Sequence, residues 1–76
     1  MLDRVTCAPI TRTIRGISSE VEVGPDQGLP TNAVINCDNL ITIPLAVLDP
    51  EPIGHLDPPS RTSLDRALRY ALDIIY

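Results

Sequence analysis

The stretch Ala33-Val34-Ile35-Asn36-Cys37-Asp38-Asn39-Leu40-Ile41-Thr42-Ile43 is the longest run of β-forming residues in the sequence. Its apolar and β-branched residues predict a strand. A polar insert at 36–39 interrupts the run, and such an insert usually marks a bulge or a bend, or a polar group placed at a functional site. The stretch therefore predicts a sheet-forming segment with an irregularity near Asp38.

Two segments upstream of 33–43 are predicted to pair with it. Residues 4–11 are rich in apolar and β-branched types and predict a strand. Pro9 within it indicates a sheet edge or the strand's end, because proline donates no ladder hydrogen bond. Residues 20–23 alternate charged and apolar side chains, which predicts a half-buried strand with both glutamates facing water. We therefore expect 4–11, 20–23 and 33–43 to share one sheet.

The remaining segments before the C-terminus carry turn-forming residues. Residues 12–19 are polar and predict a loop, and 24–30 are dense in glycine and proline and predict an exposed connection. Prolines surround residues 45–48, which are expected to form one helical turn. Residues 53–56 are a candidate for a short strand.

The C-terminal segment predicts an amphipathic helix over residues 60–75. Asp57 is a good N-cap residue, and Pro58 suits the first helical position, where its missing N–H is not needed. The pair Asp65–Arg69 lies off the apolar stripe, and its i,i+4 spacing adds only about 0.3–0.5 kcal/mol. We expect the helix to pack on the sheet through one stripe formed by Leu64, Ala67, Leu68, Ala71, Leu72 and Ile75.

Length and composition exclude several classes of protein. The 76 residues support one small domain, and eight prolines argue against a helical bundle because proline breaks helix interiors. No apolar run reaches the about 18–20 residues that cross a bilayer, and Asp3 and Arg4 interrupt the N-terminus. A cytoplasmic protein with no membrane partner is therefore expected. The net charge of −4 argues against a general nucleic-acid coat, although residues 1–19 are locally basic.

The sequence gives little support to metal or cofactor chemistry. Cys7 and Cys37 stand alone and His55 is the only histidine, so no metal site and no cofactor are expected. Both cysteines are expected to be buried free thiols. His55 is expected to be a structural or surface histidine. The sequence contains no phosphate-binding loop and no hydrolase motif.

The segment Thr11-Arg12-Thr13-Ile14-Arg15-Gly16 is the candidate for chemistry, because two hydroxyls and two guanidinium groups fall within five residues. Such groups at a strand end suit phosphate oxygens. RNA supplies its own nucleophile, the 2′-hydroxyl, so its cleavage needs only a proton acceptor, a proton donor and a cation, without metal. A solvated polar loop is the alternative, and composition alone favours it.

The order of these segments resembles the PemK/MazF family, the ribonuclease toxins of bacterial type II toxin–antitoxin systems. The resemblance covers nearly the whole chain and rests on the ordered series 5–17, 20–23, 28–30, 33–44 and 52–57, followed by the amphipathic helix. It implies an α+β fold, namely an SH3-like small β-barrel of the CcdB/PemK/MazF type with a C-terminal amphipathic helix, formed by a single domain over residues 1–76.

The resemblance also implies an activity and its partners. The activity is a metal-independent endoribonuclease (mRNA interferase) that cleaves single-stranded RNA and leaves a 2′,3′-cyclic phosphate. The partners are a cognate antitoxin, a second copy of the chain in a homodimer, and operator DNA only through the antitoxin complex, with growth regulation as the outcome. Family motifs match Thr11 and Asp38 as catalytic residues. Arg12, Thr13 and Arg15 are expected to contact RNA from the loop.

The resemblance leaves the family's opening strands without a match. Family domains begin with two strands, the second of which holds the main catalytic arginine, and this chain starts after both. We therefore expect an N-terminally truncated domain, a partial barrel, with weak or no activity. In one family branch an arginine precedes the catalytic aspartate by two residues, where this chain has Asn36. The alternative function is a non-catalytic toxin remnant that binds the cognate antitoxin, and a structural domain without a site is a third.

Overall fold

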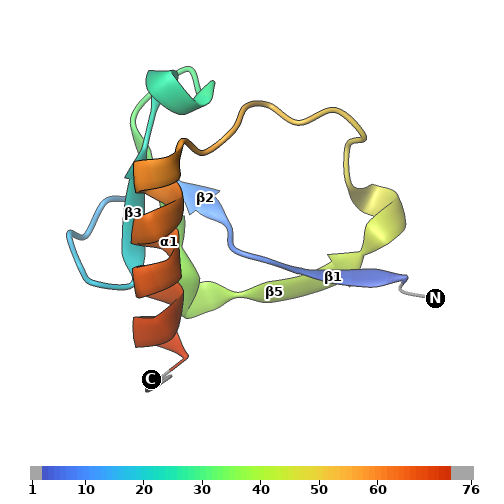
Figure 1. The fold of residues 1–76 in the computed structure, drawn as a ribbon. Coiled ribbons are helices and arrows are strands. Elements are labelled where there is room, and N and C mark those ends of the chain that lie inside the picture. The colour runs from blue at the N-terminus through green and yellow to red at the C-terminus, as the bar shows by residue number, and fades with distance from the viewer. Residues whose placement is uncertain (1–2, 73–76) are drawn as a thin grey trace.

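The computed structural model describes residues 3–72. Its strands are β1 (Arg4–Cys7), β2 (Ile10–Thr11), β3 (Glu20–Val23), β4 (Ala33–Asn36) and β5 (Ile41–Pro44), and its one α-helix in this range is α1 (Pro58–Ala71) (Figure 1). Single turns of 3-10 helix form η1 (Pro25–Gln27), η2 (Cys37–Asn39) and η3 (Leu45–Val47). The element types are those of an α+β fold. None of the described helices is long and apolar enough to span a bilayer.

The strands form two antiparallel sheets. Segments 4–11, 20–23 and 33–43 share one sheet, as predicted, through β2, β3 and β4, but the rest of 4–11 and 33–43 forms a second sheet that was not predicted. One sheet has the order β2–β4–β3, while β1 pairs only with β5 in the described residues. The reason is that both long β segments break. Segment 4–11 breaks at Pro9, which cannot donate to a ladder, and segment 33–43 breaks at η2. The irregularity predicted at 36–39 is therefore confirmed, and it is a 3-10 turn.

The two breaks lie against each other and act as one corner. The backbone N–H of Asn36 donates to the carbonyl of Pro9 at 2.8 Å. Segments 4–11 and 33–43 both leave the three-stranded sheet at this corner and pair with each other as β1 and β5 (Figure 1). The β1–β5 pair is called the arm below. Strands that bend from one sheet into another form the corners of small barrels. The described chain thus forms a partial barrel, as expected.

The helix α1 covers one face of the three-stranded sheet (Figure 1). Val21 lies opposite Ile35 and Val23 opposite Ala33, so these side chains share a face. Ala67 is the buried residue of α1 at this contact, with Leu64, Leu68 and Ala71 packed around it.

The predicted helix is confirmed over 58–71. Asp57 is its N-cap residue and Pro58 begins it, and the Arg69 Nη2 and Asp65 Oδ2 atoms are 2.9 Å apart. Leu72, expected on the apolar stripe, is 54% exposed. Ile75 lies outside the described residues.

The predicted strand at 53–56 is wrong, whereas the turn predicted at 45–48 is confirmed by η3. Gly54 packs directly against the backbone of Gln27, the last residue of η1. A Cβ atom on Gly54 would overlap the Gln27 carbonyl oxygen and lie 2.7 Å from its carbonyl carbon. The segment therefore rests on a turn and pairs with none of the strands between residues 3 and 72. His55 is exposed there.

The two cysteines are free thiols in different environments. Cys37 is 1% exposed, while Cys7 is only half-buried, so the expectation of burial holds fully for Cys37 alone. Burial and the nearby Asp38 carboxylate both raise the pKa of the Cys37 thiol. Cys37 is therefore a protonated core residue at neutral pH.

Candidate functional site

Thr11 is the last residue of β2, at an edge of the three-stranded sheet. It lies opposite Val34, which lies opposite Glu22 on β3. Directly opposed residues of an antiparallel sheet share a face, and the residues packed on α1 occupy the alternate rows, so Thr11 belongs to the face away from the helix. Its Oγ1 accepts a hydrogen bond from the Thr13 N–H at 3.2 Å. The hydroxyl hydrogen of Thr11 is left to donate to a ligand.

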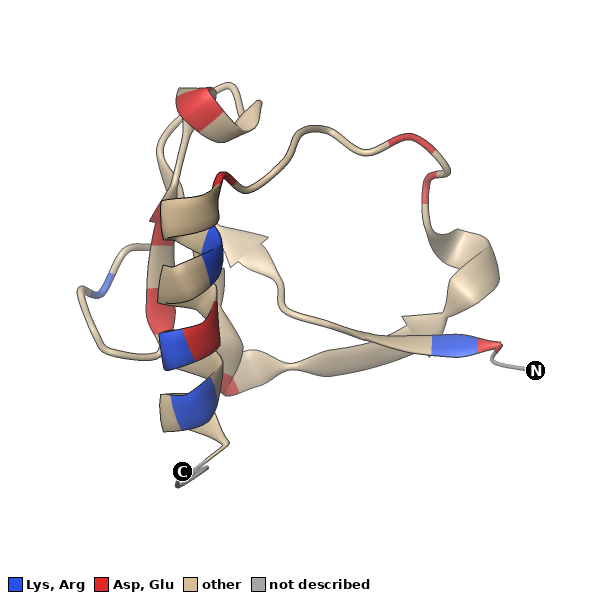
Figure 2. Cartoon of the chain, viewed as in Figure 1, with Lys and Arg blue, Asp and Glu red and all other residues tan. Residues whose placement is uncertain are grey.

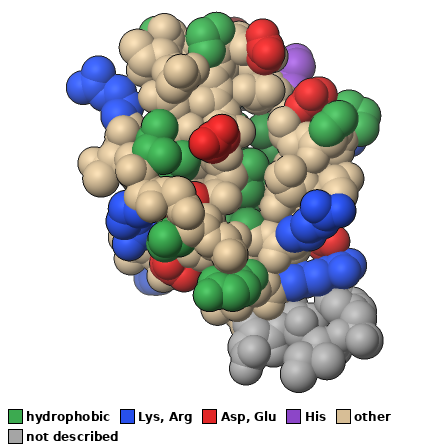
Figure 3. Space-filling model, turned by 90° about the vertical axis from the view of Figure 1, so that its left-hand side faces the viewer, with side chains coloured by type: hydrophobic (Ala, Val, Ile, Leu, Met, Phe, Trp, Pro, Cys, Tyr) green, Lys and Arg blue, Asp and Glu red, His purple; other side chains and the backbone are tan. Residues whose placement is uncertain are grey.

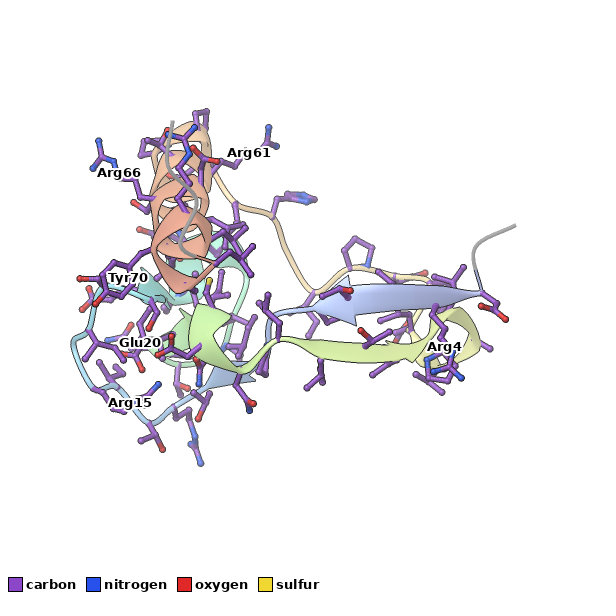
Figure 4. The ribbon with its side chains drawn as sticks, turned by 90° about the horizontal axis from the view of Figure 1, so that it is seen from below. Arg4, Arg15, Glu20, Arg61, Arg66 and Tyr70 are labelled. Atoms are coloured by element: carbon purple, nitrogen blue, oxygen red, sulfur yellow. The ribbon has the colours of Figure 1, made fainter. Side chains whose placement is uncertain are left out.

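The loop at 12–19 is tied to the sheet by Glu20, the first residue of β3. Glu20 Oε1 accepts the backbone N–H groups of Arg15 and Gly16 at 2.9 and 3.0 Å, and Oε2 accepts Arg15 Nε at 3.1 Å (Figure 4). Gly16 has a φ of +70°, which glycine adopts without strain. The Glu20 side chain is 2% exposed. The expectation that it faces water is therefore wrong, whereas Glu22 is exposed as expected.

Asp38, on η2, lies beside this loop. Its backbone N–H donates to the Asn36 side chain at 3.0 Å, which caps η2. The wholly buried Ser19 donates its hydroxyl to Asp38 Oδ2 at 2.5 Å. The backbone carbonyl of Ser19 accepts the Cys37 N–H at 2.9 Å. Arg15 Nη2 is 3.9 Å from the same Oδ2 atom. The predicted RNA-binding Arg15 and the predicted catalytic Asp38 are thus neighbours.

The structure places the five predicted site residues in two groups. Arg15 and Asp38 form an ion pair, and Thr11 and Thr13 are joined by a hydrogen bond. Arg12 is exposed on the same loop. No hydrogen bond or ion pair of the described chain joins Thr11 to Asp38. A ligand that used all five residues would have to span both groups across the width of the sheet.

Two buried polar residues of this site were missed by the sequence analysis, namely Ser19 and Glu20. Ser19 was included in the polar loop, and Glu20 was assigned to the solvent by strand alternation. The signal that could have found Glu20 is its place directly after a short loop. The N–H groups of such a loop need acceptors, and a carboxylate at the next strand's start is within reach of them.

The surface around the site has mixed charge and is not a basic groove. Acidic residues lie along β3 and arginines along α1 (Figure 2). Arg61 and Arg66 lie on α1 and Arg4 on the arm, all distant from Arg15 (Figure 4). Figure 3 shows arginine side chains at separate places on the face that bears the 12–19 loop, with apolar side chains between them. Arg15 is therefore a local cation among carboxylates.

Neither the cavities nor the acidic groups add a ligand centre to this site. A cavity of about 370 Å³ opens beside Ile14 and is lined by Glu22 and Asp26 but by no arginine, which does not suit a phosphate. A second, of about 360 Å³, is almost wholly apolar and lies near His55. Within residues 3–72, no three His, Cys, Asp or Glu side chains are placed to hold a metal ion. The candidate site lies on the face of the three-stranded sheet away from α1 and on the 12–19 loop.

Glu20 makes the stability of the loop depend on pH. Burial raises its pKa, but the hydrogen bonds from Arg15 and Gly16 and the Arg15 charge outweigh burial, so its pKa lies below the ordinary value of a glutamate. A carboxyl whose pKa is lowered by folding stabilises the fold above its unfolded pKa, and this stabilisation is lost as the pH falls through the lowered value. We expect the hydrogen-exchange protection factors of the Arg15 and Gly16 amides, measured by NMR, to fall in that acidic range. Glu20→Gln should abolish this step, and an unchanged profile in the variant would contradict the assignment.

Comparisons with known proteins bear on the whole of this architecture. The model of a family described as PemK-like, MazF-like toxin of type II toxin–antitoxin system matches residues 2–72. The chain belongs to this family. The curated Endoribonuclease MazF3 of Mycobacterium tuberculosis is 41% identical over 73 residues, which are 96% of this chain and 70% of that protein.

Solved structures of a MazF toxin and of an endoribonuclease share the fold. The Mycobacterium tuberculosis toxin MazF-mt6 matches with a TM-score of 0.91 at 40% identity, over 99% of this chain and 75% of that one. An endoribonuclease in complex with its cognate antitoxin, from a mycobacterial species, matches with a TM-score of 0.83 at 29% identity, over 99% of this chain and 70% of that one. The family resemblance and the α+β partial-barrel fold expected from it are both confirmed.

Proposed function

We propose that this PemK/MazF chain is the toxin of a type II toxin–antitoxin pair and an endoribonuclease that cleaves single-stranded mRNA. The observation that carries the proposal is the 41% identity to an endoribonuclease over 96% of this chain. The geometry supports it, since a guanidinium, held by Glu20 of β3, and the Thr11 hydroxyl at the end of β2 belong to the face of the sheet away from α1, with the Asp38 carboxylate beside the guanidinium. These are the groups that metal-free RNA cleavage requires.

In the proposed reaction, the 2′-oxygen of RNA attacks the adjacent phosphorus, the bond from phosphorus to the 5′-oxygen breaks, the leaving 5′-oxygen takes a proton from water, and a 2′,3′-cyclic phosphate remains. Asp38 is the proposed acceptor of the 2′-hydroxyl proton, since its Oδ1 atom makes no hydrogen bond to the described residues. Arg15 stabilises the phosphate charge, and the Thr11 hydroxyl donates to a phosphate oxygen. Arg12 and Thr13 contact phosphates beside the scissile one. The chemistry needs no metal and no cofactor.

The product and its metal dependence test this proposal. We expect a single-stranded RNA incubated with the chain to be cut equally well with and without EDTA, and the 5′ fragment to carry a 2′,3′-cyclic phosphate by mass spectrometry. Cleavage is expected to be weak, because no residue here matches the main catalytic arginine that the resemblance assigns to the family. Loss of cleavage in EDTA would contradict the mechanism.

The proposed partners are a cognate antitoxin, a second copy of the chain in a homodimer, and operator DNA reached only through the antitoxin complex. The outcome would be regulation of cell growth in the cytoplasm. A relative solved in complex with its cognate antitoxin supports the first of these.

A second function is antitoxin binding without catalysis. It is favoured by the two carboxylates beside Arg15, because they offset the positive charge that an RNA phosphate would need. Co-purification with the antitoxin encoded next to this chain, without RNA cleavage, would select it.

A further inference from the structure

We propose that Glu20 is a positioning residue, which holds the Arg15 guanidinium in the orientation that binds an RNA phosphate. The proposal rests on the proposed function, which gives Arg15 its contact with RNA. It assigns a role in substrate binding to a buried acidic residue that does not itself touch the substrate.

The first argument is the number of contacts that Glu20 makes to one residue. Its carboxylate binds the backbone N–H of Arg15 at 2.9 Å and the side-chain Nε of Arg15 at 3.1 Å, while also binding the Gly16 N–H at 3.0 Å. Both the origin and the head of the Arg15 side chain are thereby fixed to one buried group. An arginine held in this way loses little further side-chain freedom when it binds a ligand.

The second argument concerns the donors that remain on Arg15. Glu20 occupies the Nε–H, and the Arg15 side chain is still 48% exposed. Asp38 does not capture the other donors, because its Oδ2 atom is 3.9 Å from Arg15 Nη2 and already accepts the Ser19 hydroxyl at 2.5 Å. Within residues 3–72 the terminal Nη groups of Arg15 make no hydrogen bond, and two parallel N–H donors match two phosphate oxygens.

The third argument is that a positioning role and a purely electrostatic role of Glu20 predict opposite changes in RNA affinity when its charge is removed. Glu20 carries a negative charge close to the proposed phosphate site, so on charge alone its removal should strengthen RNA binding. If Glu20 holds Arg15 in place, its removal should weaken binding. A substitution that removes the charge therefore separates the two accounts.

The experiment measures the dissociation constant of a mixed-sequence single-stranded RNA whose 2′-hydroxyls are replaced by fluorine, so that it cannot be cleaved. We expect Glu20→Gln to weaken binding about tenfold, similar to Arg15→Ala, because each removes one charge-assisted phosphate contact. Glu22→Gln is the matched control, since it removes the same charge from an exposed glutamate of the same strand. It should leave binding unchanged or slightly tighter.

A double-mutant cycle shows whether Glu20 acts through Arg15. The variant with both Glu20→Gln and Arg15→Ala should bind no more weakly than Arg15→Ala alone. Additive losses would overturn the proposal, as would a Glu20→Gln variant that binds as tightly as the wild type. Wild-type protein that binds no RNA would overturn the proposed function and the positioning role together, which is a different result.

A second variant covers the case in which Glu20→Gln does not fold, as judged by circular dichroism. Glu20→Asp keeps the charge but is one methylene shorter, so it cannot reach the Arg15 backbone N–H and Nε together. We expect it also to weaken RNA binding, by less than Arg15→Ala. Wild-type affinity in Glu20→Asp would overturn the proposal, because the charge would then suffice without the geometry.

Discussion

Replacement of Thr11 by alanine is expected to lower the rate of RNA cleavage by about 100-fold or more, since losing one preorganised donor to a developing oxyanion costs about that much. The Thr13 N–H binds the Thr11 hydroxyl oxygen and leaves the hydroxyl hydrogen to donate, which is what the proposed role requires. The rate is measured with a fluorogenic single-stranded RNA at a protein concentration high enough to detect weak wild-type turnover.

Thr42→Ala is the control for Thr11→Ala. Thr42 lies in the arm with its hydroxyl oxygen 3.4 Å from that of Thr6, away from the candidate site. The same atoms are removed from a strand in both variants, so loss of folding can be separated from loss of chemistry. Cleavage by Thr11→Ala within twofold of the wild-type rate would remove Thr11 from the mechanism.

The Gly54→Ala variant is expected to be destabilised by about 1–3 kcal/mol, the usual cost of forcing atoms into a packed site. The added Cβ would overlap the Gln27 carbonyl oxygen and lie 3.0 Å from Gly28 Cα, and backbone atoms cannot rotate away as a side chain would. Urea unfolding followed by circular dichroism measures the free energy of unfolding. For a domain of this size such a loss is a large part of the total stability.

The Gly16→Ala variant shows how much stability is lost to backbone conformation alone, without a steric overlap. Gly16 has a positive φ, but nothing lies within 4 Å of the place where its Cβ would be, so alanine there meets only the left-handed backbone penalty of about 1 kcal/mol. We expect Gly54→Ala to be the more destabilised of the two. The reverse order would show that the 53–56 segment can move off the η1 turn at little cost.

Local sequence signals predicted the helix well but not the division into two sheets. The apolar spacing on α1 and the Asp57-Pro58 start are encoded within one segment. The sheets depend on two breaks far apart in sequence, at Pro9 and at η2, which meet only in the folded chain through the bond from the Asn36 N–H to the Pro9 carbonyl. The sequence indicated each break separately. It did not indicate that the two breaks meet and turn the chain at the same corner.

The candidate site shows the same limit. Strand alternation placed Glu20 correctly on the face away from α1, yet the 12–19 loop folds over that face and buries its carboxylate. Strand alternation predicts on which face of a sheet a side chain lies. It does not predict whether a loop folds over that face and buries the side chain. The proposed roles of Thr11 and Asp38 came from family resemblance, and the contact between Ser19 and Asp38 joins residues whose proximity no local pattern shows.

The arm is expected to be less stable than the three-stranded sheet that α1 covers. Its pairing joins Arg4 to Pro44, residues distant in sequence, over only four residue pairs, and most of its side chains are exposed. Closing so long a loop costs entropy that few buried contacts offset, and two-stranded ribbons are marginal in water. We therefore expect the arm to open at a lower free energy than the helix-covered sheet unfolds. Thr11, Arg15, Glu20 and Asp38 all lie outside the arm, so opening of the arm is expected to leave the proposed site in place.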